Sequence, residues 1–238
     1  MNLRSKTILE AAIKEYIKSG QPVSSKELAD KYDFGVKWAS VRGELGKLTK
    51  DGFLAQLHTS GGRVPTDKGY QFFVAQTLDD MADSKKILSQ RRHGELADDL
   101  QKGNLRDFVE EFAEETKLLG VGQKEKGREV YKSGLDELFE QLNLGNKKEF
   151  HEIIRDFEML DKRLEAMRSR LFHTLGARVF IGKKSPITKS DNLSVIMDTY
   201  DVGGQKVLIA IIGPKRMDYD KSLKLFKSLH KKELVNRE

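Results

Sequence analysis

Residues 53–66 read FLAQLHTSGGRVPT, and this stretch decides the fold expected for the first third of the chain. The apolar run Phe53–Leu57 predicts a strand, Ser60–Gly62 a turn and Arg63–Pro65 a short return strand. Because proline has no N–H to donate to a ladder, the return strand is expected at the edge of a sheet. The stretch therefore predicts a small β-hairpin.

Three helices are predicted before this hairpin. Residues 6–18 carry apolar side chains at spacings of three and four, which is typical of an amphipathic helix. Ser24 begins a capping box that ends at Glu27 and starts a short second helix. A tight turn at 33–35 leads to a third helix over Lys37–Asp51. Two helices joined by a tight turn and followed by a hairpin form a winged helix-turn-helix, whose last helix is free to enter a DNA major groove.

Candidate DNA-binding residues lie on the second and third helices and around the hairpin. Arg42 can pair with a guanine through two hydrogen bonds, or can be a solvated helix charge. For Trp38, a place in the core and a contact with DNA are both open. Hydroxyl, His and Arg side chains of the hairpin can donate to phosphates without reading a base. The candidates are Ser25, Lys26, Lys37, Trp38, Ser40, Arg42, His58, Thr59, Ser60, Arg63 and Lys68, and Glu44 is a further candidate on the outward side of the third helix.

Two glycines, Gly43 and Gly46, stand inside the third helix. Each costs about 1 kcal/mol relative to alanine there. A close approach to another backbone would explain them, and that backbone can belong to DNA or to a neighbouring helix.

Residues 58–70, HTSGGRVPTDKGY, resemble the signature H-T-S-A-G-R-I-P-T-D-K-G-Y of the HrcA heat-inducible transcription repressors. The two mismatches are a glycine for alanine and a valine for isoleucine. Residues 15–32, EYIKSGQPVSSKELADKY, resemble the first helix, turn and second helix of that family. Residues 36–45, VKWASVRGEL, resemble its recognition helix V-S-x-A-T-I-R-N-E-M, although Gly43 cannot pair with adenine as the family's asparagine could.

The remainder of the chain predicts helices followed by strands. Residues 76–103 are rich in charge and predict a helical connector with little to bury. Helices are expected from Asn104 to Leu119, around 130–142 and over 149–172, with an interruption at 120–127. Strands are expected at 178–181, 193–200 and 207–212, the last two joined by a turn at Gly203-Gly204, and a basic amphipathic helix from about Tyr219.

The closing strands ARVFIGKKSPI, TYDVGGQKV and IIGPKRMDY resemble the GAF-like domain of the same family. The middle of the chain is shorter than in full-length members, so this domain is expected to be truncated. The predicted fold class is α+β, with a winged helix-turn-helix at 1–78, a helical connector at 79–115 and a small GAF-like α/β domain for regulation and dimerisation at 116–238.

Composition and motifs argue against several other classes of protein. No apolar run approaches the ~20 residues of a membrane span, and MNLRSKTILE is followed by no apolar segment of a signal peptide, so a cytoplasmic protein is expected. Cysteine is absent, which excludes disulfides and thiolate metal sites. The five histidines are scattered, and no phosphate-binding loop, nucleophile elbow or dinucleotide fingerprint is found. We therefore expect no enzyme, no cofactor and no metal.

The distribution of charge points to an anionic partner for the first third of the chain. Residues 1–75 hold 12 Lys and Arg against 8 Asp and Glu, whereas residues 76–182 hold 19 against 22. The leading hypothesis is a repressor that binds double-stranded DNA at an inverted repeat as a homodimer. The resemblance implies the CIRCE inverted repeat upstream of chaperone genes, and control by the GroEL chaperonin. The alternatives are a winged-helix regulator whose C-terminal domain senses a small ligand, and a winged helix used for protein contacts.

Overall fold

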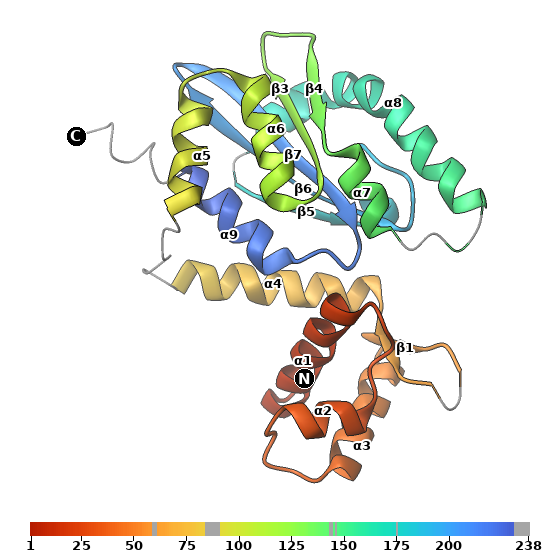
Figure 1. The fold of residues 1–238 in the computed structure, drawn as a ribbon. Coiled ribbons are helices and arrows are strands. Elements are labelled where there is room, and N and C mark those ends of the chain that lie inside the picture. The colour runs from red at the N-terminus through yellow and green to blue at the C-terminus, as the bar shows by residue number, and fades with distance from the viewer. Residues whose placement is uncertain (59–60, 84–90, 143–144, 146, 175, 231–238) are drawn as a thin grey trace. The chain divides into compact units, whose positions relative to one another are not determined.

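The chain folds into two compact units, residues 1–79 and residues 80–238 (Figure 1). The computed structural model describes residues 1–58, 61–83, 91–142, 145, 147–174 and 176–230. Helices and antiparallel sheets occur together, which confirms the α+β class. None of the helices in these ranges is long and apolar enough to cross a bilayer.

The first unit contains the predicted three helices and hairpin. Its elements are α1 (Leu3–Ser19), α2 (Ser25–Lys31), α3 (Trp38–Lys50), β1 (Leu54–Gln56), β2 (Arg63–Pro65) and α4 (Asp67–Asp83), of which residues 80–83 belong to the second unit. The Ser24 hydroxyl accepts a hydrogen bond from the Glu27 amide at 3.1 Å, as a helix-capping serine should. Strands β1 and β2 pair antiparallel from Leu54 opposite Pro65 to Gln56 opposite Arg63.

One apolar core holds the first unit together. It is formed by fully buried side chains of all three helices and the hairpin, among them Ile8, Leu9, Ile13, Leu28, Val41, Leu45, Leu48 and Leu54. Val41, Leu45 and Leu48 are the inner face that the spacing in the third helix predicts. Burying these positions leaves the opposite side of α3 facing solvent.

The second unit is built on a five-stranded antiparallel sheet in the order β4-β3-β7-β6-β5. The strands are β3 (Leu119–Lys124), β4 (Val130–Ser133), β5 (Arg178–Ile181), β6 (Leu193–Val202) and β7 (Gln205–Pro214). Helices α5 (Arg91–Gln101), α6 (Leu105–Thr116) and α9 (Tyr219–His230) lie on one side of the sheet, and α8 (Lys147–Phe172) lies on the other (Figure 1). The short α7 (Leu135–Gln141) and a 3-10 turn, Gly182–Lys184, complete the unit.

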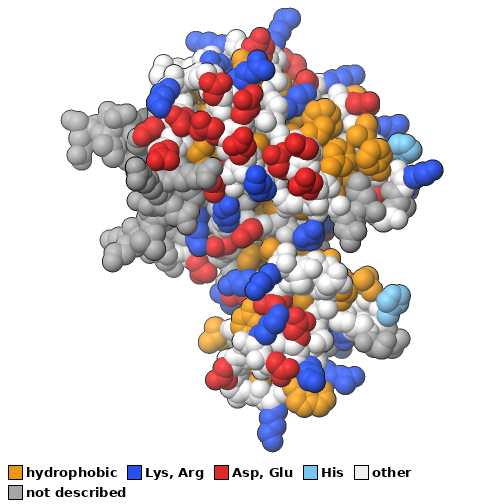
Figure 2. Space-filling view, in the orientation of Figure 1, with side chains coloured by type: hydrophobic (Ala, Val, Ile, Leu, Met, Phe, Trp, Pro, Cys, Tyr) orange, Lys and Arg blue, Asp and Glu red, His pale blue; other side chains and the backbone are white. Residues whose placement is uncertain are grey.

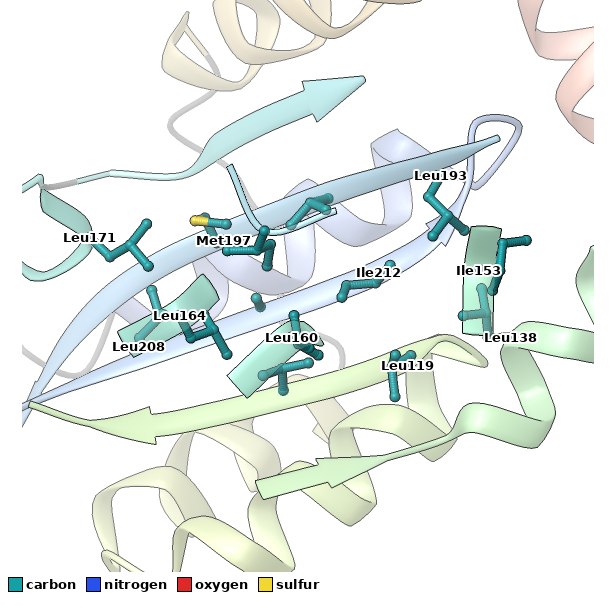
Figure 3. Close-up of a cluster of buried hydrophobic side chains, with 14 of the residues drawn as sticks. Leu119, Leu138, Ile153, Leu160, Leu164, Leu171, Leu193, Met197, Leu208 and Ile212 are labelled. Carbon is teal, nitrogen blue, oxygen red and sulfur yellow. The ribbon is translucent and has the colours of Figure 1, made fainter. Parts of the chain in front are cut away.

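A buried cluster joins α8 to the sheet (Figure 3). Leu160 and Leu164 of α8 meet alternate residues of the central strands, such as Met197 and Leu208. The long apolar stripe of this helix is therefore used inside the unit, as packing on a sheet requires. The β6–β7 hairpin, its turn at Gly203-Gly204 and helix α9 confirm the predictions for the last third of the chain.

Two expectations for the middle of the chain differ from the structure. Residues 119–124 and 130–133 form strands β3 and β4, where a helix end, an interruption and a helix start are expected from the sequence. Residues 76–103 are expected to have little to bury, but α5 buries Leu96 and Leu100 within the second unit. The high density of charge in this segment hid the two leucines. The helix predicted from Asn104 is confirmed as α6, in which Phe108 and Phe112 are buried.

Candidate nucleic-acid interface

The solvent-facing side of α3 and its N-cap residue carry four of the eleven predicted DNA-binding residues. Lys37, Ser40 and Arg42 are exposed, and Trp38 is 55% exposed, so a place in the core is excluded for this tryptophan. Lys37 and Arg42 make no ion pair with another described residue, which leaves both cations available to a ligand. Lys47 and Lys50 add two further cations to this side. Lys50 lies two helical turns after Gly43, so the helical period alone predicts that both share one face.

Glu44 is not part of this outward side, contrary to the expectation from the sequence. Its carboxylate is buried, where it accepts a hydrogen bond from the Ser5 hydroxyl at 2.7 Å and pairs with Lys47 Nζ at 2.8 Å. The hydrogen bonds from Lys47 and Ser5 hold the pKa of the Glu44 carboxyl below its ordinary value. Glu44 therefore anchors α3 to α1, and it is the only acidic residue of α3.

The surroundings of Gly43 and Gly46 exclude one of the two explanations offered for these helix glycines. A Cβ atom added at Gly43 or at Gly46 would meet no atom within 4 Å in the described part of the chain. A neighbouring helix is therefore not the reason for either glycine. Both lie on the exposed side of α3, between the cations.

A groove lies between the start of α2, helix α3 and the hairpin. It brings Ser25, Arg42 and Arg63 together from three elements that the sequence keeps far apart. Its remaining lining residues are Val23, Ser24, Leu45, Gln56, Gly61 and Gly62. The groove is therefore polar along much of its wall and offers donors from more than one direction.

The segment before α2 forms one wall of this groove, a feature that the sequence did not reveal. Val23 exchanges two backbone hydrogen bonds with Arg63, at 2.9 and 2.8 Å, and so continues the small sheet. Gly62 permits this approach, since a Cβ there would lie 2.6 Å from the carbonyl carbon and oxygen of Pro22. Gly62, in the glycine pair of the 58–70 motif, thus lets the hairpin pack against the segment before α2.

Two of the predicted DNA-binding cations are already bonded within the protein. The Arg63 side chain is half-buried and donates to the Thr49 hydroxyl and to the Gly61 carbonyl. Lys68 is exposed, but its ammonium donates to the Asp51 carbonyl at 2.8 Å, at the C-terminal end of α3, and lies 4.4 Å from the centre of the Phe53 ring.

The other candidates lie at the ends of this surface. Lys26 is exposed on α2, Ser25 is half-buried at the start of that helix, and His58 is exposed where the hairpin approaches its turn. Thr59 and Ser60 lie outside the described residues.

Comparison with known proteins adds to this geometry. The sequence model described as "HrcA protein C terminal domain" matches residues 52–223. The chain belongs to the HrcA family. This confirms the resemblance seen at residues 58–70 and in the closing strands.

Named HrcA relatives resemble the chain over different lengths. The heat-inducible transcription repressor HrcA of Moorella thermoacetica is 24% identical over 95% of both chains. That alignment runs over 335 positions, more than the 238 residues of this chain, so the Moorella protein contains segments that this chain lacks. The HrcA of Roseiflexus castenholzii is 51% identical over 76 residues, which are 32% of this chain and 21% of that protein.

A crystal structure described only as that of a hypothetical protein has the same fold. Its TM-score is 0.74 at 16% identity, and the match covers 96% of each chain. The α+β arrangement of this HrcA-family chain is therefore found in an experimental structure over almost its whole length.

Proposed function

We propose that this HrcA-family chain is a sequence-specific DNA-binding repressor of heat-shock genes, a binding protein rather than an enzyme. In this proposal residues 1–78 are a winged helix-turn-helix, α3 enters the major groove and the hairpin is the wing. The chain binds an inverted repeat of the CIRCE kind as a homodimer. The names of its relatives, heat-inducible transcription repressors, support this class of function.

One observation carries the proposal: every charged side chain on the exposed side of α3 is a cation. Arg42, Lys47 and Lys50 of α3 and Lys37 at its N-cap are exposed, whereas Glu44, the single acid of the helix, is buried against α1. An exposed acid, Asp51, follows only at the C-terminal end of the helix. A duplex presents a dense row of phosphates, and neutralising them with Lys and Arg releases counterions and favours binding. The exposed glycines between these cations leave room for a close approach of the DNA.

The residues of the surface have different roles in this proposal. Arg42, which is exposed and makes no ion pair with another described residue, pairs with a guanine. Lys26 and Lys37 contact phosphates, Ser25 and Ser40 donate from the helix starts, and Trp38 packs against the DNA. At the wing, His58, Thr59 and Ser60 donate hydrogen bonds to the phosphate backbone of the DNA beside the major groove. Lys68 supports the end of α3 through Asp51 and Phe53.

The second unit serves dimerisation in this proposal, and its visible face is unsuited to DNA. Figure 2 shows Asp and Glu side chains gathered over α5 and α6, and the hollow there is lined by five acids, one cation and one leucine: Glu95, Asp98, Asp99, Glu111, Glu114, Lys102 and Leu96. Such a surface repels phosphates. A single winged helix makes few base contacts, so two copies on an inverted repeat supply the specificity.

The proposal predicts that Arg42→Ala weakens binding to an inverted-repeat duplex by ~1–3 kcal/mol and relaxes the preference at one base position per half-site. Fluorescence anisotropy with a labelled CIRCE duplex, and with the same duplex substituted at each position in turn, measures both effects. Lys14→Ala, at an exposed cation of α1, is the matched control because it removes the same charge from another helix.

Two results would contradict this assignment. Equal affinity of the wild-type chain for the inverted repeat and for a scrambled duplex would exclude sequence-specific binding. An Arg42→Ala variant with unchanged affinity and base preference would show that α3 is not the recognition helix.

We also propose, from the family resemblance, that a GroEL-type chaperonin controls how much active repressor is present. Such control needs only marginal stability, because 1–2 kcal/mol moves a large fraction of molecules between folded and unfolded states. Refolding the urea-denatured chain with and without GroEL, followed by a gel shift on the CIRCE duplex, measures it. More shifted duplex is expected with chaperonin and ATP, and equal amounts would contradict the chaperonin's role.

A further inference from the structure

Arg63 differs from Arg42, the other cation of the groove, because its side chain is hydrogen-bonded on two sides. Its Nε donates to the Thr49 hydroxyl at 3.0 Å, and one of its terminal nitrogens donates to the Gly61 carbonyl at 3.2 Å. Lys26, Lys37 and Arg42 are exposed, whereas Arg63 is half-buried. The guanidinium therefore joins the C-terminal half of α3 to the hairpin turn.

The hydrogen bonds around Thr49 form a consistent set. The Thr49 hydroxyl has one proton, which it donates to the Leu45 carbonyl at 2.8 Å, and a free lone pair that accepts from Arg63. The backbone of Arg63 is also fixed, since its N–H and C=O both bond Val23. One arginine thus connects three segments: α3, the hairpin and the chain before α2.

We infer that Arg63 is a positioning residue, which holds the hairpin against α3 through Thr49, rather than a contact to a DNA phosphate. This inference rests on the proposed DNA binding and refines it. The bonds to Thr49 and Gly61 use two of the five guanidinium N–H groups and fix the place and orientation of the group, so it cannot move toward a phosphate without breaking them. Held in place, it sets the distance between wing and recognition helix, on which simultaneous contact with the duplex depends.

The two roles predict different effects of substitutions in the full chain. Arg63→Lys keeps the charge but has no planar fork that could reach both Thr49 and Gly61. Thr49→Val removes the acceptor hydroxyl at nearly constant shape and leaves Arg63 in place, whereas Thr49→Ser keeps the hydroxyl. A phosphate contact would tolerate Arg63→Lys and would not depend on Thr49.

The test measures affinity for a labelled CIRCE duplex over a series of NaCl concentrations. We expect Arg63→Ala, Arg63→Lys and Thr49→Val to bind about 10-fold more weakly, as for one lost hydrogen bond to a charged group, with the salt slope of the wild type. Thr49→Ser should bind like the wild type, and Arg63→Ala combined with Thr49→Val no more weakly than either alone. Lys37→Ala is the control, whose salt slope should fall by about 1.

A salt slope reduced by about 1 in Arg63→Ala, or wild-type affinity in Arg63→Lys or in Thr49→Val, would overturn the inference.

A second measurement needs no DNA and separates this inference from the proposed function. Amide hydrogen exchange in residues 54–56 and 63–64 should be faster in Arg63→Ala and in Thr49→Val than in the wild type, because the hairpin loses its tie to α3. Unchanged exchange in both variants would overturn the positioning role. If the wild-type chain bound no duplex, the proposed function would fail, and exchange would still decide what Arg63 does.

Discussion

At the scale of single residues, Gly62 and Gly46 lie in the same unit but differ in their steric surroundings. At Gly62 a Cβ would lie 2.6 Å from the backbone of Pro22, so the folded chain itself requires a glycine. At Gly46 a Cβ would meet no atom of the described residues within 4 Å, and the residue is exposed in the middle of α3. No described neighbour requires a glycine at this position, and the proposed approach of DNA to α3 accounts for it.

Gly46→Ala is therefore expected to stabilise the first unit and to weaken DNA binding at the same time. The gain in stability is up to about 1 kcal/mol, from the higher helix propensity of alanine. Urea unfolding followed by the fluorescence of Trp38, the single tryptophan, measures the stability of this unit. Anisotropy with the CIRCE duplex measures the binding, in which the added methyl group should hinder the approach of the DNA.

Gly62→Ala is the comparison for this variant, and it should unfold at lower urea because of its clash with Pro22. A Gly46→Ala variant that is more stable and binds the duplex as well as the wild type would show that α3 does not approach DNA at this position.

At the scale of elements, two buried carboxylates on α1 and α3 hold the three helices together. Glu15 of α1 pairs with Lys31 Nζ of α2 at 2.5 Å and accepts a hydrogen bond from the Tyr32 hydroxyl at 2.9 Å. Glu44 of α3 in turn bonds Ser5 of α1. The hydrogen bond from Lys31 lowers the pKa of Glu15, and Lys47 and Ser5 lower that of Glu44.

These pKa directions predict a loss of stability in acid. A carboxyl whose pKa is lower in the folded than in the unfolded state stabilises the fold above its unfolded pKa, near 4.5. That contribution disappears as the pH falls below 4.5 and through the folded pKa. The urea midpoint reported by Trp38 should therefore fall from about pH 5 to pH 3 in the wild type, and less steeply in Glu15→Gln and in Glu44→Gln.

Glu10→Gln is the matched control on α1, because Glu10 makes no ion pair with another described residue, and it should keep the wild-type pH dependence. The same slope in all three variants would show that neither carboxylate links the helices.

The elements also show what a sequence reveals and what it conceals. The helices of the first unit and the β6–β7 hairpin follow from local spacing and turn residues, and they were predicted. Strand β3 was missed because Gly120 and Gly122 resemble a break. In the folded chain a Cβ at Gly122 would lie 2.6 Å from Val109, so glycine lets α6 pack on the sheet, a contact between distant segments that no local pattern reports.

In the candidate site, too, local sequence patterns do not report contacts between distant segments. The exposed side of α3, with Arg42 and Lys37, follows from the helical period. The burial of Glu44 and the bonds of Arg63 depend on Ser5 and Thr49, partners 39 and 14 residues away. Side-chain type alone marked both residues as available for DNA.

At the scale of the whole molecule, the proposed function assigns a separate task to each of the two units. Residues 1–79 have their own apolar core and carry the basic side of α3, and residues 80–238 have a separate core around the five-stranded sheet. The first unit should therefore fold when it is produced alone, and the second should provide the contact between two copies.

A fragment of residues 1–79 is expected to fold but to bind the inverted repeat on the order of 100-fold more weakly than the full chain, because a linked second site raises the effective concentration of the first. Circular dichroism and urea unfolding report whether the fragment folds, and native mass spectrometry of the complexes counts the chains on each duplex. Residues 80–238 alone should have the mass of a dimer. Since a folded monomeric fragment keeps all its own DNA contacts, its affinity for a single half-site should equal that of the full chain. Full affinity of the fragment for the inverted repeat would show that the second unit does not join two copies on DNA.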